Sequence, residues 1–149
     1  MVSGIASNIR IYLWNQDEKT SRLNSPTNKL SLLDAPTFAS TLGQVVFLMT
    51  ISKRHRDLKI SMIEEVVSTA ILLQQFKLYS KDERPIAFLA WATVSDEVKE
   101  EFESSGRTLE LKDWRSGENL IVVECVSPFA AEKDITAQFF KNQTKAESR

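Results

Sequence analysis

The sequence predicts an α+β domain in which helices pack on a mainly antiparallel sheet. Between Thr37 and Leu72, apolar residues recur every three or four positions, which is typical of helices with one buried face. Between Phe76 and Ala92 they alternate around a charged turn, which indicates a β-hairpin. A further apolar strand at 120–126 lies between two more helical segments, and this order of elements favours an α+β fold.

Two helices are expected first. One covers 37–51, where the apolar residues at helical spacing are Phe38, Leu42, Val45, Val46 and Met49. The other covers about 58–72, where they are Ile60, Ile63, Val67 and Ile71. A polar and basic loop at 52–57 separates the two helices.

The remaining elements follow from local signals. The hairpin joins strands 76–79 and 86–92, and Pro85 can begin the second strand because its missing N–H falls at the strand end. Ser95 is placed to cap a helix that runs to about Glu103 and ends near Gly106. Strand 120–126 ends before Pro128, and a last helix is expected over 132–141.

We expect one folded domain with two flanking segments. Residues 1–35 form an N-terminal extension, and its polar, turn-rich part at 15–28 is predicted to be mobile. Residues 36–141 form the domain, and 142–149 form a polar tail that is expected to fray. Alternating residues at 9–13 could add a strand to the sheet.

Composition excludes several classes of partner. Lys and Arg number 19 against 20 Asp and Glu, so the sequence offers neither a basic footprint for nucleic acid nor a polybasic membrane anchor. No apolar run reaches the ~18 residues that span a bilayer, and the start lacks a signal-peptide pattern. The single cysteine, Cys125, excludes an internal disulfide. We therefore expect a cytoplasmic protein without a transmembrane segment or nucleic-acid partner.

Several chemistries lack their residues. One histidine and one cysteine leave no set of zinc ligands, so no metal site is expected. The chain has no glycine-rich phosphate loop and no Gly-x-Ser-x-Gly elbow. Cys125 is most simply a small core residue.

His55 is the only histidine, and it lies between Arg54 and Arg56 in the polar loop. An imidazole is the side chain best suited to move protons near neutral pH, so His55 is a candidate general base. The alternative is a solvated loop histidine without a catalytic role. In either case we expect His55→Ala to leave the melting temperature nearly unchanged, because the position looks exposed.

Glu124 follows four apolar residues and precedes Cys125 and Val126. A carboxylate in such a strand must face outward or be buried with a partner that offsets its desolvation. If it is buried, it could hold a histidine in one tautomer. The alternative is an exposed position on a sheet with one solvated face.

Asp113, Trp114 and Gly117 belong to a compact turn that we interpret as structural. Asp113 can close an Asx turn, Trp114 supplies a buried anchor, and Gly117 can adopt a positive φ. Backbone N–H groups of this turn could also face a developing oxyanion.

A series of short segments shares its order and spacing with one protein family. The segments are Leu42-Gly43-Gln44-Val45, Leu48-Met49, Ser52-x-x-His55-Arg56, Gln75-Phe76-x-Leu78-Tyr79, Pro85-Ile86-Ala87-Phe88, Trp91-Ala92, Ser95, Asp113-Trp114-x-Ser116-Gly117 and Glu124-x-Val126-x-Pro128-Phe129. Together they resemble the toxin-activating lysine acyltransferases of Gram-negative bacteria. The match covers residues 41–129, and no single motif carries it.

This resemblance implies a fold like that of the GNAT acetyltransferases, without their coenzyme A loop. Family members take a fatty acyl chain from acyl carrier protein and attach it to internal lysines of an RTX protoxin. The resemblance therefore implies acyl-acyl carrier protein as the donor, an RTX-type protoxin as the substrate and no bound cofactor. It places the family's catalytic histidine on His55 and the nearby serine on Ser52. The catalytic acid, usually Asp, falls on Glu124.

The chain departs from the family at two places. The family's Pro-Phe-Gly is Pro128-Phe129-Ala130 here, and the chain ends soon after Phe139-Phe140, where family members continue into another strand.

A catalytically weak or inactive relative that binds acyl carrier protein or another partner is the alternative function. A basic cluster could dock an acidic carrier protein in either case, or it could be a solvated loop; its members are Lys53, Arg54, Arg56 and Lys59. The chain could also form a homodimer.

Overall fold

The computed structural model describes residues 34–148. The proposed extension at 1–35, with its candidate strand at 9–13, therefore lies almost entirely outside the described residues.

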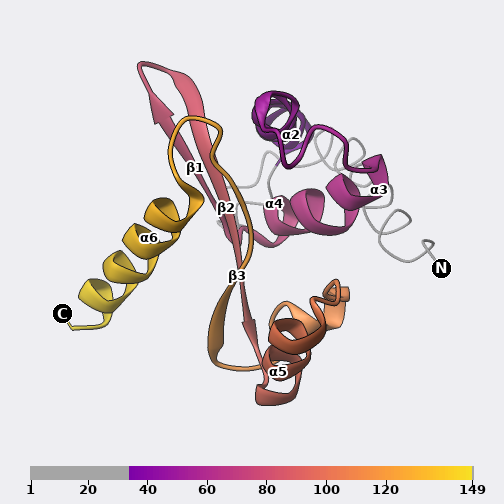
Figure 1. Cartoon of the computed structure of the whole chain (residues 1–149), viewed down its shortest axis with the longest axis vertical. Coiled ribbons are helices and arrows are strands. Elements are labelled where there is room, and N and C mark those ends of the chain that lie inside the picture. Colours follow the sequence, from indigo (N-terminus) through magenta and orange to yellow (C-terminus); the bar gives the residue numbers. More distant parts are fainter. Residues whose placement is uncertain (1–33, 149) are drawn as a thin grey trace, which may run out of the picture.

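The described chain is built on a three-stranded antiparallel sheet with strand order β1-β2-β3. The strands are β1 (Phe76–Lys81), β2 (Arg84–Val94) and β3 (Asn119–Val126). Helices cover both faces of this sheet (Figure 1). The predicted α+β class is confirmed, and the architecture is consistent with a GNAT-like acyltransferase fold.

Helix α2 (Ala35–Ile51) matches the first predicted helix and begins two residues earlier. Asp34 caps it, because the Asp34 side chain accepts a hydrogen bond of 2.7 Å from the Thr37 N–H. Its buried residues are Phe38, Val45, Leu48 and Met49. The helix ends at Ser52, so its last turn delivers the chain into the loop that carries His55.

The second predicted helix contains a π-helical turn. Helix α3 (Ile60–Met62), the π-helical segment η1 (Ile63–Ser68) and helix α4 (Thr69–Leu73) follow one another without a break. Ile60 was expected on the buried face but is 82% exposed. It is the first residue of the helix, and the wider π turn rotates the residues on its two sides relative to each other. A regular 3.6-residue period therefore misplaces Ile60.

The hairpin is confirmed, with longer strands and a tighter turn than expected. Asp82 and Glu83 form the turn, and both adopt positive φ angles of 49° and 62°. Pro85 lies opposite Ser80, where the pairing of β1 and β2 is irregular, so its missing N–H removes no regular ladder bond.

The two faces of β2 pack against different helices. One face contributes Phe88, Ala90, Ala92 and Val94 to the core beneath α2 and α4. On the other face Trp91 stacks on Phe139 of helix α6 (Glu132–Glu147), with ring centroids 5.1 Å apart. Figure 1 shows α6 on the opposite side of the sheet from α2.

Helix α6 extends beyond its predicted end at 141. The expectation of a frayed tail from 142 is wrong as far as Glu147, because the helix continues to that residue. Lys, Gln, Ala and Glu at 141–147 are good helix formers, and Phe139 anchors the preceding turns against the sheet.

A β-bulge precedes Glu124. Ala90 pairs with Glu124 and Trp91 pairs with Val122, which leaves Val123 without a partner on β2. Bulges bend a strand and redirect its side chains. Because residues directly opposite each other share a face, Glu124 lies on the face of Ala90, towards α2.

Ser95 caps helix α5 (Asp96–Ser105) by accepting the N–H of Val98, and the helix ends at Gly106, as predicted. Asp113 has a different role from the one expected. Its carboxylate accepts the N–H of Glu110, three residues earlier, at 2.9 Å. It therefore caps the short 3₁₀ helix η2 (Leu111–Asp113) instead of closing the turn that follows.

Trp114 is fully buried, as predicted. Gly117 was expected to adopt a positive φ, but it does not. Among the described glycines, Gly106 is the one with a positive φ. A Cβ on Gly117 would lie 2.5 Å from the carbonyl oxygen of Val94 and 2.6 Å from the backbone of Ser95. Gly117 is therefore required because two backbone segments approach each other closely.

We predict that Gly117→Ala lowers the free energy of unfolding by about 1–3 kcal/mol, because backbone atoms must move to admit the methyl group. Gly43→Ala is the matched control. Gly43 lies within α2 with nothing near its added Cβ, so this substitution should raise stability by about 0.5–1 kcal/mol. Urea unfolding of both variants measures the difference. Equal stabilities would contradict the close approach.

Candidate functional site

The loop after α2 turns two side chains inward. Of residues 52–59, Ser52 and His55 alone are buried. The backbone N–H groups of His55 and Arg56 both donate to the carbonyl oxygen of Ser52, at 3.1 and 3.0 Å. This tight turn places residues three apart on the same side of the loop, facing the sheet.

His55 is buried, and the hypothesis of a solvated loop histidine is wrong. Its side chain has no exposed surface. Ser52 Oγ lies 2.6 Å from Nδ1, and Glu124 Oε1 lies 3.1 Å from Nε2. The polar neighbours in the sequence suggest exposure, but the burial comes from β3, which is distant along the chain. His55 and Glu124 therefore approach each other as their hypothesised pairing requires.

Glu124 is half-buried and receives several hydrogen bonds on one oxygen. Besides His55, the N–H of Cys125 donates to Oε1 at 2.9 Å, and Arg54 Nη2 lies 2.5 Å away. Burial raises the pKa of Glu124, but the hydrogen bonds from His55 and Arg54, the charge of Arg54 and the Cys125 N–H outweigh that effect. The pKa of Glu124 is therefore below its ordinary value, and the side chain is a carboxylate at neutral pH.

The partners of His55 suit the protonated ring. A carboxylate can only accept, so Glu124 is matched to an N–H at Nε2. The Ser52 hydroxyl can donate to Nδ1 or accept from it, so it supports either state of that nitrogen. In the imidazolium form, both ring N–H groups would have acceptors. The arrangement can therefore take up a proton on His55 without leaving a buried donor unpaired.

Arg54 was expected to contribute to a docking surface, but it turns towards Glu124 and α6. Its Nη2 contacts the Cys125 carbonyl oxygen at 2.9 Å and Glu132 Oε2 at 3.1 Å, in addition to Glu124. Burial lowers the pKa of Arg54, but both carboxylates outweigh this, so its pKa is raised and the charge persists. The other basic residues of the cluster, Lys53, Arg56 and Lys59, are exposed. The sequence analysis did not identify Glu132, since nothing local marks it.

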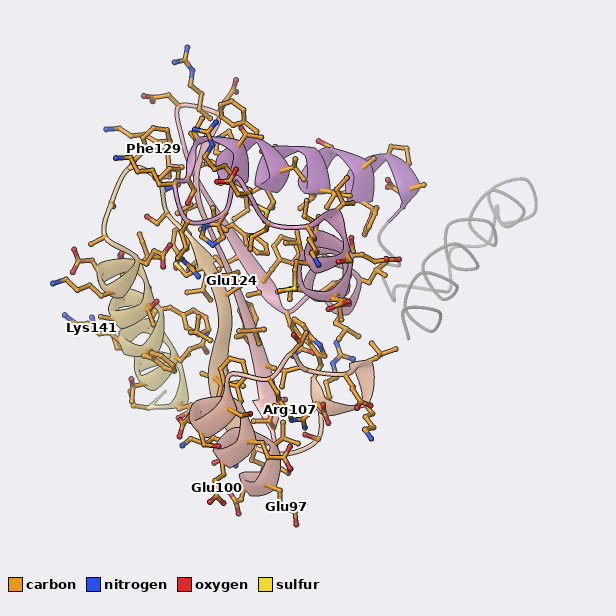
Figure 2. All side chains as sticks on the ribbon, turned by 45° about the vertical axis from the view of Figure 1, so that its right-hand side comes forward. Glu97, Glu100, Arg107, Glu124, Phe129 and Lys141 are labelled. Carbon is orange, nitrogen blue, oxygen red and sulfur yellow. The ribbon has the colours of Figure 1, made fainter. Side chains whose placement is uncertain are left out.

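An open groove runs between β3 and α6, and Glu124 is part of its lining. Its charged lining comes from Arg54, Glu124, Glu132 and Lys133, and its apolar lining comes from Val122, Val123, Ala137 and Phe140. Figure 2 shows Glu124 on β3, between α2 and α6. The groove is the surface through which a reactant can approach Glu124.

Cys125 is buried, as expected for a core residue. Burial, together with the charge of Glu132, raises the pKa of the Cys125 thiol to about 11. A protonated thiol is a poor nucleophile at neutral pH, so Cys125 does not serve as an attacking group.

Two of the backbone N–H groups in the turn at 113–117 are already hydrogen-bonded. The N–H of Ser116 donates to the Asp113 carbonyl oxygen, and the N–H of Gly117 donates to that of Thr93, both at 3.2 Å. The bond from Gly117 to Thr93 holds the turn on β2. The N–H groups of Ser116 and Gly117 are therefore not free to face an oxyanion, and the structural role of Asp113, Trp114 and Gly117 remains our interpretation.

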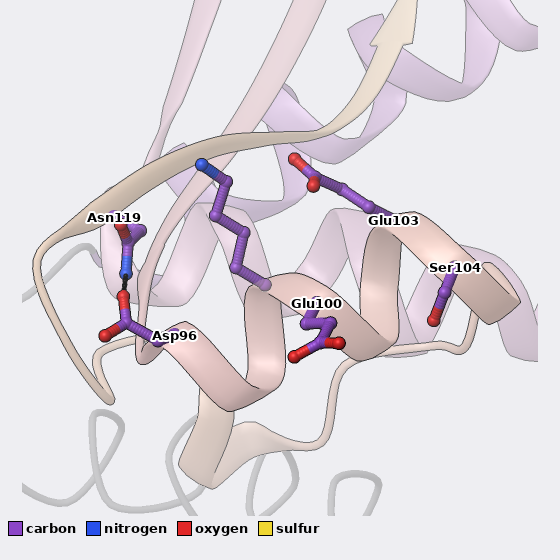
Figure 3. A pocket seen from close by; sticks show the side chains of 6 residues that line it. Asp96, Glu100, Glu103, Ser104 and Asn119 are labelled. Carbon is purple, nitrogen blue, oxygen red and sulfur yellow. Dashed lines mark hydrogen bonds between the residues drawn. The ribbon is translucent and has the colours of Figure 1, made fainter.

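A second hollow lies along α5 and is lined by charged residues (Figure 3). There, the Asn119 amide donates to Asp96 Oδ1 at 2.8 Å and to the Val94 carbonyl oxygen at 3.0 Å. These bonds tie the start of β3 to α5. None of the candidate catalytic residues lines this hollow.

Two further properties concern residues 34–148. None of their helices combines the length and apolar character needed to cross a membrane. No group of three or more His, Cys, Asp or Glu side chains within this range is arranged to hold a metal ion.

The model of the RTX toxin acyltransferase family matches residues 35–148. The chain belongs to this family. The match includes the loop with Ser52 and His55 as well as Glu124 on β3. The expected departure at Ala130 is accommodated locally, because Ala130 has no positive φ and its carbonyl oxygen accepts the Ser127 hydroxyl at 2.8 Å.

Individual relatives are similar to the chain over more than half of its length. The chain is 33% identical over 103 residues to an uncharacterized protein of Synechocystis sp., covering 68% of this chain and 70% of that protein. It is 30% identical over 112 residues to a lysine-acyltransferase of Vibrio cholerae, covering 74% and 73%. It is 32% identical over 90 residues to a protein-lysine myristoyltransferase of Kingella kingae. That match covers 60% of this chain but only 54% of the Kingella protein, so the chain spans about half the length of that relative.

The burial of His55 reverses the expectation for its stability. We predict that His55→Ala lowers the free energy of unfolding by about 2 kcal/mol or more, because it removes a buried ring together with its hydrogen bonds to Ser52 and Glu124. Lys53→Ala, on the exposed side of the same loop, should change it by no more than about 0.5 kcal/mol. Chemical denaturation measures both. A neutral His55→Ala would restore the solvated interpretation.

Proposed function

We propose that the chain is a protein-lysine acyltransferase that moves a fatty acyl group from acyl carrier protein to internal lysine ε-amines of an RTX-type protoxin. The observation that carries this proposal is the linked set Ser52–His55–Glu124 in a member of the RTX toxin acyltransferase family. The printed names of the Vibrio and Kingella relatives support lysine as the acceptor.

In the proposed reaction, His55 acts as the base. A lysine amine is mostly protonated at pH 7, so it must lose a proton before it can attack. Because Nε2–H donates to Glu124, the basic nitrogen of neutral His55 is Nδ1, which takes this proton through the Ser52 hydroxyl, and Glu124 stabilises the resulting imidazolium. The amine then attacks the thioester carbonyl, the C–N bond forms and the C–S bond breaks. His55 returns its proton to the departing thiolate, and the second proton, which the nitrogen loses as the amide forms, is released to solvent.

An acylated His55 is the alternative path, with the imidazole as nucleophile. Hydrogen bonds engage both ring nitrogens, and the ring has no exposed surface. Attack by His55 on a thioester would require the loss of one of these bonds and the opening of the site. These two features favour proton transfer and direct attack by the lysine amine.

The donor arrives as a protein in this proposal, so no bound cofactor is needed. Lys53, Arg56 and Lys59 are exposed on the loop that carries His55, and they form a basic face for an acidic carrier protein. Arg54 is excluded from this face because its charge is paired with Glu124 and Glu132. Such a donor fits a cytoplasmic enzyme.

A binding protein without transfer activity is the second candidate. It is favoured by the closed state of the site, since His55 has no exposed surface and Arg54 contacts Glu124 on the groove side. In this interpretation, the basic face binds carrier protein, and the buried set has a structural role alone.

We predict that His55→Gln reduces acyl transfer by about 100-fold or more, because glutamine can hydrogen-bond but cannot act as a base. Glu124→Gln should lose less activity, because the amide keeps the size of the side chain. The measurement is intact-mass analysis of a candidate RTX substrate after incubation with acyl-loaded carrier protein, at equal concentrations of folded enzyme. Arg84→Ala, at the exposed end of the hairpin, is the control with unchanged activity.

Two outcomes would contradict the proposal. Equal rates for the wild type and His55→Gln would remove His55 from the chemistry. A wild-type chain that binds carrier protein but modifies no lysine would establish the binding function in place of the enzyme.

A further inference from the structure

The Arg54 head group covers the exposed part of the candidate site. The imidazole of His55 has no exposed surface, and the Glu124 side chain is 17% exposed. This exposed part of the pair borders the groove, where Arg54 Nη2 lies 2.5 Å from Glu124 Oε1. The Arg54 side chain is itself 55% exposed. An amine that approaches through the groove must therefore enter where the Arg54 head group lies.

The position of Arg54 Nη2 suits an ammonium group better than the guanidinium nitrogen that lies there. Three acceptors surround this single nitrogen: Glu124 Oε1 at 2.5 Å, the Cys125 carbonyl oxygen at 2.9 Å and Glu132 Oε2 at 3.1 Å. A guanidinium nitrogen of this kind carries two hydrogens, whereas the ammonium group of lysine carries three. An ammonium nitrogen at this point could satisfy all three acceptors.

The three acceptors come from separate parts of the fold. Glu124 lies on the α2 side of the sheet, the Cys125 carbonyl oxygen belongs to β3, and Glu132 begins α6. Because their positions are set by β3 and α6, the set does not depend on Arg54 alone. The partly exposed Arg54 head can leave without uncovering the apolar core.

We propose that the substrate's lysine side chain displaces Arg54, and that Glu124, the Cys125 carbonyl oxygen and Glu132 then hold its ε-ammonium group. This inference rests on the proposed function for the identity of the ligand. The bound nitrogen contacts Glu124 Oε1, the atom that also accepts the hydrogen bond from His55 Nε2, so the ammonium group is held beside the His55–Glu124 pair. In the absence of substrate, Arg54 keeps the two carboxylates paired.

The direct test uses n-butylammonium, which has the same four carbons and ammonium group as the lysine side chain. Arg54→Ala vacates the site, and the ring signals of the single histidine report on ligands at Glu124 by NMR. Butyltrimethylammonium is the matched probe, because it has the same charge type but no N–H donor. Titrations are compared at constant ionic strength, so that general screening is equal for both probes.

We expect n-butylammonium to shift the His55 signals of Arg54→Ala saturably, and butyltrimethylammonium to leave them unchanged. Binding should be about ten-fold weaker or more in Arg54→Ala/Glu132→Gln, which loses one charged acceptor, and in the wild type, where Arg54 competes. Equal shifts from both probes, or no saturable shift in Arg54→Ala, would overturn the ammonium site. Arg54→Met, which keeps an aliphatic stem, replaces Arg54→Ala if that variant does not fold.

Acyl-transfer kinetics separate this inference from the proposed function. If Arg54 competes with the substrate lysine, Arg54→Ala should lower KM for the acceptor protein without lowering kcat, whereas Arg84→Ala should change neither. A raised KM with a lowered kcat would overturn the displacement. If n-butylammonium binds as expected but the wild type transfers no acyl group, the ammonium site stands and the proposed function fails.

Discussion

The hydrogen bond between His55 and Glu124 is the interaction on which the rest of the site depends. It joins residues 69 positions apart, and it forms where the loop after α2 meets the bulged part of β3. A buried imidazole without acceptors would be costly, and so would a half-buried carboxylate without donors. The carboxylate supplies an acceptor to the imidazole, and the imidazole supplies a donor to the carboxylate. The exit of α2 at Ser52 and the bulge at Val123 are the local features that bring the two side chains together.

Arg54 links the loop that carries His55 to β3 and α6, beside the His55–Glu124 pair. It contacts Glu124 on one side of the sheet, the Cys125 carbonyl oxygen on β3, and Glu132 on α6. The paired strands alone would not connect α6 to the loop that carries His55. This arrangement explains why a residue expected to dock a partner is paired within the protein, while its neighbours Lys53 and Arg56 remain exposed. It also places the Arg54 head group beside Glu124 in the groove.

Local patterns in the sequence were sufficient to predict the elements that depend on neighbouring residues. The cap at Ser95, the hairpin around Asp82 and the strand with Glu124 all have such signals, and the structure confirms them. The exposure of Ile60 could not be predicted, because a π turn alters the helical period without a sequence signature. The burial of His55 was missed because β3, and not its own loop, covers it. Glu132 was missed because its role exists only once α6 packs beside β3.

The central claim is that His55 and Glu124 act as one unit in acyl transfer, and a double-mutant cycle on kcat/KM tests it most directly. If they act as a unit, adding Glu124→Gln to His55→Gln should cost little beyond the loss caused by His55→Gln alone, since the base through which Glu124 acts is already absent. If the two losses multiply as independent effects, the residues contribute separately and the claim is contradicted.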